Sequence, residues 1–282
     1  MTISALRPNN RPKIQVFSPG MHFASVPVVP SLFPGCRSLI TTSVNAVVAA
    51  MLAPACAVCS DLLDEPLSGC VCRNCWRSIK PITPPVCNDC GDPLPRAGAH
   101  CMDCTGRHSA VTRARAVGEY EGTLREIIHA LKYSNRLSLA QPLASQMRIR
   151  GGDVLGDVDC VIPVPLHWRR EQQRGFNQAR EIARYLGPPV VCALVRRRAT
   201  RPQIELAADQ RKANVAAAFG PNNWFRAPDI RGKRVLLIDD VSTTGATLDA
   251  CARVLHELGV RSVDALTAAR VITRRAAPRR NP

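Results

Sequence analysis

The sequence predicts an α/β protein with an open, mainly parallel sheet and helices on both faces, preceded by a small cysteine-rich zinc-binding module. Two observations support this fold class. From residue 110 onward, short apolar runs alternate with stretches of helical periodicity, which is typical of a doubly wound sheet. Before that point, four Cys-x-x-Cys pairs follow one another within about fifty residues, which is typical of metal binding.

We expect four parts along the chain. Residues 1–50 form an N-terminal extension with scattered Pro and Arg, which ends in an amphipathic helix at about Val44–Leu52. Residues 51–108 form the zinc module, residues 109–272 the α/β domain, and residues 273–282 a basic tail. Both ends of the chain are polar and basic, so we expect them to be solvated and poorly ordered.

Composition limits the classes of partner. The net charge of +16 favours anionic partners, either phosphates or nucleic acid. The stretch from Ser38 to Ser60 has no charged residue, but its Thr, Ser and Asn content is high for a membrane segment, so we expect no membrane insertion. The thirteen cysteines occur mostly in pairs suited to thiolate metal sites, which predicts a reducing compartment, the cytoplasm.

The cysteine pairs are separated by 12, 11 and 10 residues, the spacing of zinc ribbons. Each pair places two thiolates on one tight turn, and two pairs complete a tetrahedron, so four pairs predict two structural zinc ions. The spacing leaves open whether the pairs join sequentially or in a crossed arrangement. Cys70, His100 and His108 are rival ligands that we rank as bystanders. The predicted ligands are Cys56, Cys59, Cys72, Cys75, Cys87, Cys90, Cys101 and Cys104.

The elements of the α/β domain follow from periodicity. Apolar residues at 124, 127, 128 and 131 have helical spacing, and a second helix is expected at Asn177–Leu186. Continuous apolar or β-branched runs predict buried parallel strands. These strands are expected at Ala114–Tyr120, Asp159–Val164, Val190–Val195, Val235–Ile238 and Ser262–Thr267.

A basic segment follows the strand that ends at Pro163-Val-Pro165. Arg169, Arg170 and Arg174 lie there beside Gly175, and their placement at a strand exit predicts an anion-binding loop rather than an ordinary solvated face. A long basic segment after residue 196 has few core signals, which is typical of a lid or binding loop.

The most informative stretch begins with the apolar strand Val235–Ile238, continues through Asp239 and Asp240, and runs through small residues into a helix at Leu248–Leu258. Ligands of open α/β sheets bind outside the carboxyl ends of strands. Small residues before a helix let backbone N–H groups converge on a phosphate, while adjacent carboxylates suit sugar hydroxyls or a divalent metal. The stretch therefore predicts a phosphorylated-sugar site. The alternative is a plain helix cap by Asp240 or Ser242.

This stretch resembles the phosphoribosyl-pyrophosphate (PRPP) signature of type I phosphoribosyltransferases. The chain contains, in this order, the Cys pairs, Leu131-Lys132-Tyr133, Pro163–His167, Arg174–Gln178 and the Asp239-Asp240 loop. This order resembles that of the ComF family of competence-associated proteins. The resemblance covers about residues 53–269. It implies a type I phosphoribosyltransferase fold, PRPP bound with Mg²⁺, and in some members a role in the uptake of single-stranded DNA.

The resemblance also implies roles for individual residues. Asp239 and Asp240 would be the catalytic pair that holds the ribose hydroxyls. Asn135 and Glu205 stand where members of the family commonly have glycine, which puts the local loop geometry in question. The 5′-phosphate would be bound by Ser242, Thr243, Thr244, Gly245, Ala246 and Thr247. The pyrophosphate candidates are Arg169, Arg170 and Arg174, and the lid candidates are Lys132, Gln203, Arg211 and Asn214.

Three functions are compatible with these residues. The first is a phosphoribosyltransferase, a pentosyl glycosyltransferase that transfers the 5-phosphoribosyl group from PRPP to an acceptor. The second is a catalytically silent module that binds single-stranded DNA and works with other DNA-uptake proteins. The third is a nucleobase salvage phosphoribosyltransferase of nucleotide metabolism, which a zinc module does not favour because such catalysis does not require zinc.

Overall fold

The structure is a computed structural model, in which we describe residues 41, 43–48, 51–98, 100–106, 108–197, 218–223 and 229–272. The chain is divided into two units, Met1–Val44 and Asn45–Pro282, and the named elements all lie in the second unit. Residues 43–48 and 51–52 are helical, in agreement with the helix expected there. The lid candidates Gln203, Arg211 and Asn214 lie outside the described residues, as do the basic tail and residues 1–40.

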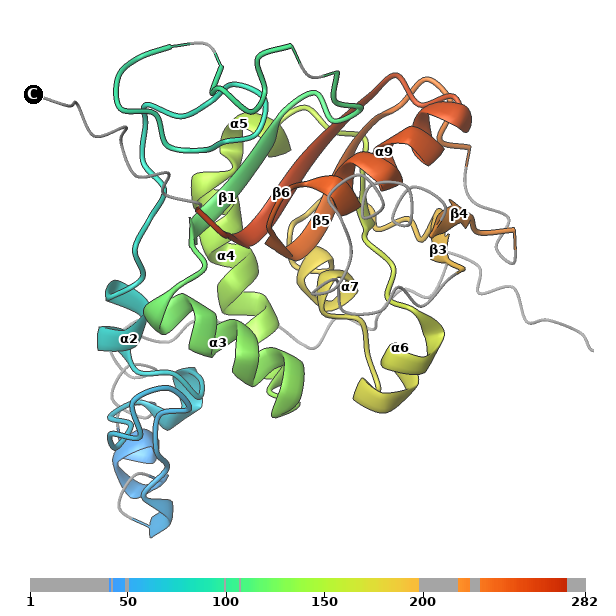
Figure 1. Cartoon of the computed structure of the whole chain (residues 1–282). Coiled ribbons are helices and arrows are strands. Elements are labelled where there is room, and N and C mark those ends of the chain that lie inside the picture. Colours follow the sequence, from blue (N-terminus) through green and yellow to red (C-terminus); the bar gives the residue numbers. More distant parts are fainter. Residues whose placement is uncertain are drawn as a thin grey trace, which may run out of the picture. The chain divides into compact units, whose positions relative to one another are not determined.

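Within the described ranges, a main sheet contains four parallel strands in the order β1-β6-β5-β2 (Figure 1). The inner strand β5 aligns Ile238 with Leu266 of β6 and with Pro163, the last residue of β2. The parallel arrangement confirms the predicted fold class. The strands are β1 (Ala114–Glu119), β2 (Cys160–Pro163), β5 (Arg234–Ser242) and β6 (Ser262–Arg270).

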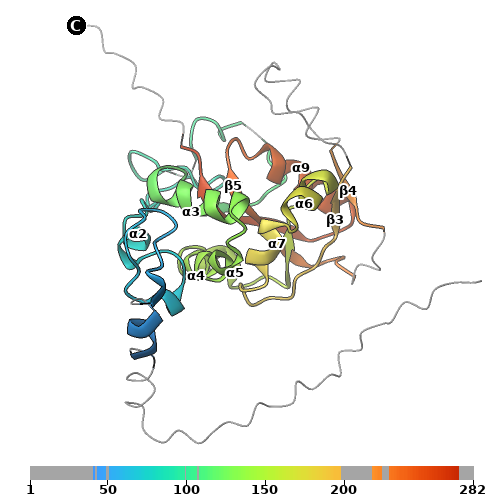
Figure 2. The same cartoon turned by 90° about the horizontal axis from the view of Figure 1, so that it is seen from below.

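Helices cover both faces of this sheet because β5 is apolar on both faces. Leu236 and Ile238 pack into one core, and Val235 and Leu237 pack into the other, as the period of two along a strand requires. Figure 2 shows α4 and α7 on one side of β5 and α9 on the other. The first core also contains residues of α3 (Gly122–Tyr133), α4 (Ala140–Arg150) and α7 (Gln178–Ala183). The second core contains residues of α9 (Ala246–Glu257) and of the antiparallel pair β3 (Leu194–Arg196) and β4 (Phe219–Pro221).

Two predicted elements differ from the structure. The segment expected as an anion-binding loop is the helix α6 (Trp168–Arg174), because His167 accepts the Arg169 N–H at its start and Gly175, with φ 78°, ends it. The strand expected at Val190–Val195 is reduced to β3 and to a bridge between Val190 and Val161. The helices α4 and α5 (Gly152–Leu155) were not predicted.

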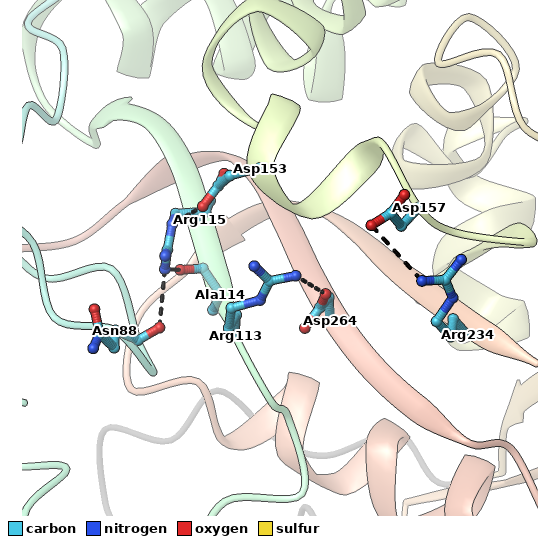
Figure 3. Close-up of polar contacts among 8 residues, drawn as sticks. All are labelled: Asn88, Arg113, Ala114, Arg115, Asp153, Asp157, Arg234 and Asp264. Carbon is cyan, nitrogen blue, oxygen red and sulfur yellow. Dashed lines mark hydrogen bonds and ion pairs between the residues drawn. The ribbon is translucent and has the colours of Figure 1, made fainter. Parts of the chain in front are cut away.

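Arginine–aspartate pairs lie near the amino-terminal ends of β1, β5 and β6, and two of them connect β1 and β5 to α5 and the segment that follows it (Figure 3). These arginines are engaged by carboxylates, and their side chains are partly exposed, so each pair contributes little to stability. We assign this end of the sheet a structural role. The pairs are Arg113–Asp264 at 2.9 Å, Arg115–Asp153 at 2.8 Å and Arg234–Asp157 at 3.7 Å. None of the helices in the described ranges is long and apolar enough to cross a membrane.

The cysteine-rich segment forms two sets of four thiols, and within each set all four Sγ atoms lie within 4.8 Å of one another. The pairs therefore join sequentially, which the spacing alone did not decide. Cys70 and His108 belong to no candidate metal group of the described residues, in agreement with their ranking as bystanders, whereas His100 forms a further candidate group with Cys87 and Asp89. The first set is Cys56, Cys59, Cys72 and Cys75; the second is Cys87, Cys90, Cys101 and Cys104.

The two sets share one backbone pattern. The Cys56 N–H donates to the Asp61 carbonyl at 2.7 Å, and the Cys87 N–H donates to the Asp92 carbonyl at 2.8 Å. In each knuckle, the residue before this aspartate has a left-handed backbone conformation, with φ 63° at Ser60 in the first and φ 74° at Gly91 in the second. Asp61 and Asp92 thus occupy equivalent positions in a duplicated zinc knuckle.

The geometry of the thiols fits zinc. The Cys56–Cys75 Sγ distance is 3.9 Å and the Cys59–Cys72 distance is 3.7 Å, close to the edge of about 3.8 Å of a tetrahedron with Zn–S bonds of about 2.3 Å. Burial raises the pKa of Cys56, but backbone N–H groups, including that of Cys72, outweigh it and lower this pKa to about 6. The backbone of the knuckle therefore favours the thiolate form of Cys56, whereas the pKa of Cys59 is raised to about 11 and that of Cys75 is also raised.

Zinc analysis of cysteine variants tests the sequential pairing. We expect two zinc ions per wild-type chain and one in a Cys59→Ser/Cys72→Ser variant, because both substitutions fall in the first set. A Cys59→Ser/Cys90→Ser variant also loses two thiols but damages both sets, so it should lose both ions. Metal content by mass spectrometry of purified protein distinguishes the two variants. A single zinc ion retained in the second variant would contradict the assignment.

Candidate functional site

The carboxyl end of β5 places Asp239 and Asp240 at the edge of the sheet. Because neighbouring side chains of a strand point to opposite faces, the two carboxylates meet different surroundings. Asp240 is two residues after Ile238 and therefore lies on the same face, which α3 covers. Asp239 is two residues after Leu237 and lies on the other face, which α9 covers. The Asp240 N–H donates to Asp239 Oδ1 at 2.8 Å, which fixes the first carboxylate against the backbone.

Asp240 is paired with Lys132, the penultimate residue of α3. The Lys132 Nζ lies 2.6 Å from Asp240 Oδ1, and both side chains are largely buried. Burial alone would lower the pKa of Lys132, but the Asp240 carboxylate outweighs this effect and raises it above its usual value. Lys132 therefore stays charged and balances Asp240 at the site, where the sequence suggested a lid residue.

Asp239 has less compensation. Burial raises the pKa of Asp239 to about 7, and the negative charge of Asp240 adds to the rise. Lys132 and Arg196, the last residue of β3, act in the opposite direction. The Arg196 guanidinium also lies over the Phe219 ring, 5.3 Å from its centroid. The site thus holds a carboxylate that would be stabilised by further hydrogen-bond donors or by a cation.

The segment after β5 leads into α9 with an open helix terminus. Gly245 is the N-cap, with φ 75°, and no side chain caps the helix. The Thr244 hydroxyl accepts the Ala246 N–H at a long 3.4 Å. The alternative that Asp240 or Ser242 caps the helix is therefore wrong. The first-turn N–H groups and the positive end of the dipole are arranged as in anion-binding helix termini.

A cavity of about 580 Å³ lies between α3 and α6, and neither Asp239 nor Asp240 is among its lining residues. Lys132 lines it together with Arg170 and Arg174, so three cations surround one space. Arg174 also donates to Gln178 Oε1 at 3.0 Å, which fixes its guanidinium. The third predicted pyrophosphate residue, Arg169, is not among the lining residues, and its guanidinium lies over Trp168 instead. The remaining lining residues are Tyr133, Asn135, Gln173 and Phe176.

Asn135 explains one departure from the family pattern. Its φ is 51°, in the left-handed region that glycine enters freely and that asparagine tolerates better than most other residues. The position therefore keeps the backbone conformation of a glycine, and the Asn135 side chain lines the cavity. The other departure, Glu205, lies outside the described residues.

Two arginines near the site were not found from the sequence. Arg196 was counted with a basic linker, and Arg270 was expected to lie beyond the last strand, whereas it is the final residue of β6 and only 8% exposed. At Arg270, the sequence signal for a buried functional residue is a charged residue directly after a run of small apolar residues. Arg196 gave none, because arginines surround it in the sequence.

The raised pKa of Asp239 predicts a pH-dependent stability. The folded protein holds the Asp239 proton more tightly than the unfolded chain, so this group costs stability as pH rises from about 4 to about 7. We expect Asp239→Asn to raise the melting temperature relative to wild type, with a larger gain near pH 8 than near pH 5.5. Thermal unfolding across this range tests it, with the exposed Asp157→Asn as the control. A pH-independent difference would contradict the prediction.

Family models match two parts of the chain. The phosphoribosyl transferase domain matches residues 172–282, which include β5, the loop after it and α9. The double zinc ribbon domain matches residues 47–105, which include both thiol sets. A superposition on orotate phosphoribosyltransferase from Aeropyrum pernix covers 51% of this chain at 22% identity with a TM-score of 0.29, so it does not by itself define the fold.

Curated relatives match both parts together. Competence protein F of Haemophilus influenzae is 31% identical over 206 residues, which cover 68% of this chain and 87% of the relative. DNA utilization protein YhgH of Escherichia coli K12 is 30% identical over the same shares of both chains, and Competence protein ComFC of Bacillus subtilis is 32% identical over 67% and 79%. The chain therefore belongs to the ComF family of competence proteins, with a double zinc ribbon followed by a domain of the type I phosphoribosyltransferase fold.

Proposed function

We propose that the protein binds PRPP with Mg²⁺ at the carboxyl end of β5 and transfers its 5-phosphoribosyl group to an acceptor. The observation that carries this proposal is the juxtaposition of two carboxylates, the partly buried Asp239 and the buried Asp240, with the uncapped N-terminus of α9. Carboxylates accept hydrogen bonds from a sugar diol, and the helix terminus binds a phosphate. A phosphorylated sugar satisfies both halves of the site.

The charge balance fits the magnesium complex of PRPP. Lys132 contacts Asp240 at 2.6 Å, whereas the pKa of Asp239 is raised because its charge is incompletely balanced. Sugar hydroxyls or a nearby divalent cation would relieve this imbalance. Mg²⁺ would be held mainly by the diol and pyrophosphate of the substrate with several retained waters, and it would supply charge neutralisation at the pyrophosphate.

The cations of the cavity support group transfer. In the proposed reaction the acceptor attacks the anomeric carbon while its bond to the pyrophosphate oxygen breaks, and the pyrophosphate leaves with both bonding electrons. Arg170 and Arg174 line the space next to Asp240 and Lys132, where they would stabilise that charge. Preorganised charge and orientation would then provide the catalysis without a nucleophilic side chain.

Two further proposals concern the location of the protein and the organisation of its chain. The thiolate sets favour a reducing environment, so we place the protein in the cytoplasm. The division into residues 1–50, 51–108, 109–272 and 273–282 remains our proposal for its organisation. In this scheme PRPP is the small-molecule partner and the acceptor is a nitrogenous base or a similar nucleophile.

Calorimetric titration of PRPP with Mg²⁺ tests the site. We expect micromolar binding to zinc-replete wild type, and a loss of about 100-fold or more in Asp239→Ala/Asp240→Ala, because two acceptors of the diol disappear. Asp153→Ala/Asp157→Ala removes the same charge at the opposite edge of the sheet and should bind as wild type does. Asp240→Asn should abolish pyrophosphate release in a screen of acceptor bases while the protein stays folded.

The outcomes separate binding from turnover. Absence of PRPP binding in folded, zinc-replete wild type would overturn the proposed function. Binding without pyrophosphate release from any acceptor would indicate a PRPP-binding module without turnover. Equal loss of affinity in both double variants would show that net charge, rather than the site at the end of β5, controls binding.

A second candidate is single-stranded DNA binding by the zinc module. Two relatives are named for competence and others for DNA utilization, and a cavity of about 640 Å³ beside the first thiol set is lined by Trp76 with Arg77 and Arg150. Asp64 and Glu65 also line it, and Glu65 pairs with the third lining arginine, Arg73, at 2.9 Å. An aromatic ring among arginines is typical of single-strand binding surfaces. The low aromatic content of 4% limits the candidate, because stacking platforms usually have several rings.

Salt-dependent DNA binding tests this second candidate. We expect Arg77→Ala/Arg150→Ala to weaken binding of a single-stranded oligonucleotide and to reduce the slope of log affinity against log salt by about one to two, because phosphate contacts are lost. Arg231→Ala/Arg261→Ala removes two exposed charges elsewhere and should have little effect. Fluorescence anisotropy at several salt concentrations measures both. Equal effects in the two variants would assign binding to net charge alone.

A further inference from the structure

The second thiol set and the proposed phosphate loop share a wall. A small cavity of about 40 Å³ is lined on one side by Cys90 and Cys104 and on the other by Thr244 and Gly245. Arg270 lines the same cavity. These residues are far apart in the sequence, and β6 brings them together, because Arg270 aligns with Ser242 in the parallel register of β5 and β6.

Arg270 connects the two sides through its guanidinium. Its Nε donates to Asp92 Oδ1 of the second knuckle, and its Nη1 donates to the Ser242 hydroxyl at 3.4 Å. Arg270 is 8% exposed and Ser242 is 5% exposed, so water competes little for these contacts. The Val271 N–H donates to the Ser242 carbonyl at 2.9 Å, which holds the backbone of the two residues together.

The knuckle that carries Asp92 is fixed against the sheet. The Ala114 N–H of β1 donates to the Asp89 carbonyl at 2.6 Å. A Cβ atom at Gly91 would lie 2.6 Å from the Ala114 carbonyl oxygen, so only glycine permits this approach. The position of Asp92 therefore depends on the fold of the second knuckle, and a zinc knuckle depends on its metal for that fold.

Charge gives Arg270 a second role. Four thiolates around one Zn²⁺ carry a net charge of −2, and a sugar 5′-phosphate is also anionic, so the two repel each other across a region of low dielectric. Burial alone would lower the pKa of Arg270, but Asp92, Cys90 and Cys104 outweigh it and raise this pKa. Arg270 thus remains a cation between the thiolates and the loop.

We propose that Arg270 is a positioning residue that makes the phosphate loop depend on zinc in the second thiol set. Loss of zinc from that set would release Asp92, let Arg270 move from Ser242, and weaken phosphate binding. Loss of zinc from the first set would not, because Asp61, the equivalent of Asp92, is exposed. The effect on ligand affinity rests on the proposed function; the effect on the loop does not.

The test uses the full chain and matched variants. Asp92→Ala breaks the contact to Arg270. Asp61→Ala is the control, because it removes the carboxylate at the equivalent position of the first knuckle. Arg270→Gln removes the cation, and Arg270→Lys keeps the charge without the two-pronged geometry. Cys90→Ser/Cys104→Ser and Cys59→Ser/Cys72→Ser each remove one zinc site. For each protein we would measure zinc content, amide hydrogen exchange in residues 241–249, and the affinities for PRPP with Mg²⁺ and for ribose 5-phosphate.

We expect Asp92→Ala, Arg270→Gln and the second-set variant to exchange faster in residues 241–249 and to lose about tenfold in affinity for both ligands. Asp61→Ala and the first-set variant should match wild type, and Arg270→Lys should fall between. Unchanged exchange in Asp92→Ala, or an equal effect in Asp61→Ala, would overturn the inference. If wild type binds neither ligand, the proposed function fails, and the exchange comparison alone still decides whether the second knuckle holds the loop.

Discussion

The structure depends on how two adjacent carboxylates are accommodated at the end of a strand that is buried on both faces. Like charges on neighbouring residues repel, but alternation along β5 turns Asp239 and Asp240 to opposite faces of the sheet. One face supplies Lys132 from α3 and the other supplies Arg196 from β3. The site is therefore assembled from elements on both faces of the sheet, and a ligand that touches both carboxylates links the two faces.

The sequence predicted the strands best where continuous apolar runs leave one interpretation. Residues 235–238 are all apolar because both faces of β5 are covered, and such runs are typical of parallel strands. The helix α4 was missed because its buried face consists partly of Ala140 and Ala144, while Arg148 and Arg150 lie near its end, so its amphipathic pattern is weak. Tertiary packing, rather than periodicity, defines this helix.

The site could be predicted in part for a related reason. Asp239, Asp240 and the loop to Thr247 are contiguous, so one segment shows their chemistry, whereas Arg196 and Arg270 reach the site only through β3 and β6. The arginines of the basic segment before Gly175 suggest ligand contacts, so the sequence predicts a loop there. The segment forms a helix because His167 caps its start, and that helix orients Arg170 and Arg174 toward one cavity.

The duplicated knuckles show how neighbours change the role of one motif. Both have the same backbone hydrogen bond from the first cysteine to an aspartate five residues later, so their internal geometry cannot distinguish them. The first knuckle contributes Cys56 and Cys75 to the core that also contains α3, where a tetrahedral zinc site adds rigidity to a protein with few aromatic residues. The second directs Asp92 to Arg270 at the end of β6. A structural metal site that contacts a binding loop through one partly buried ion pair can control that loop without touching the ligand.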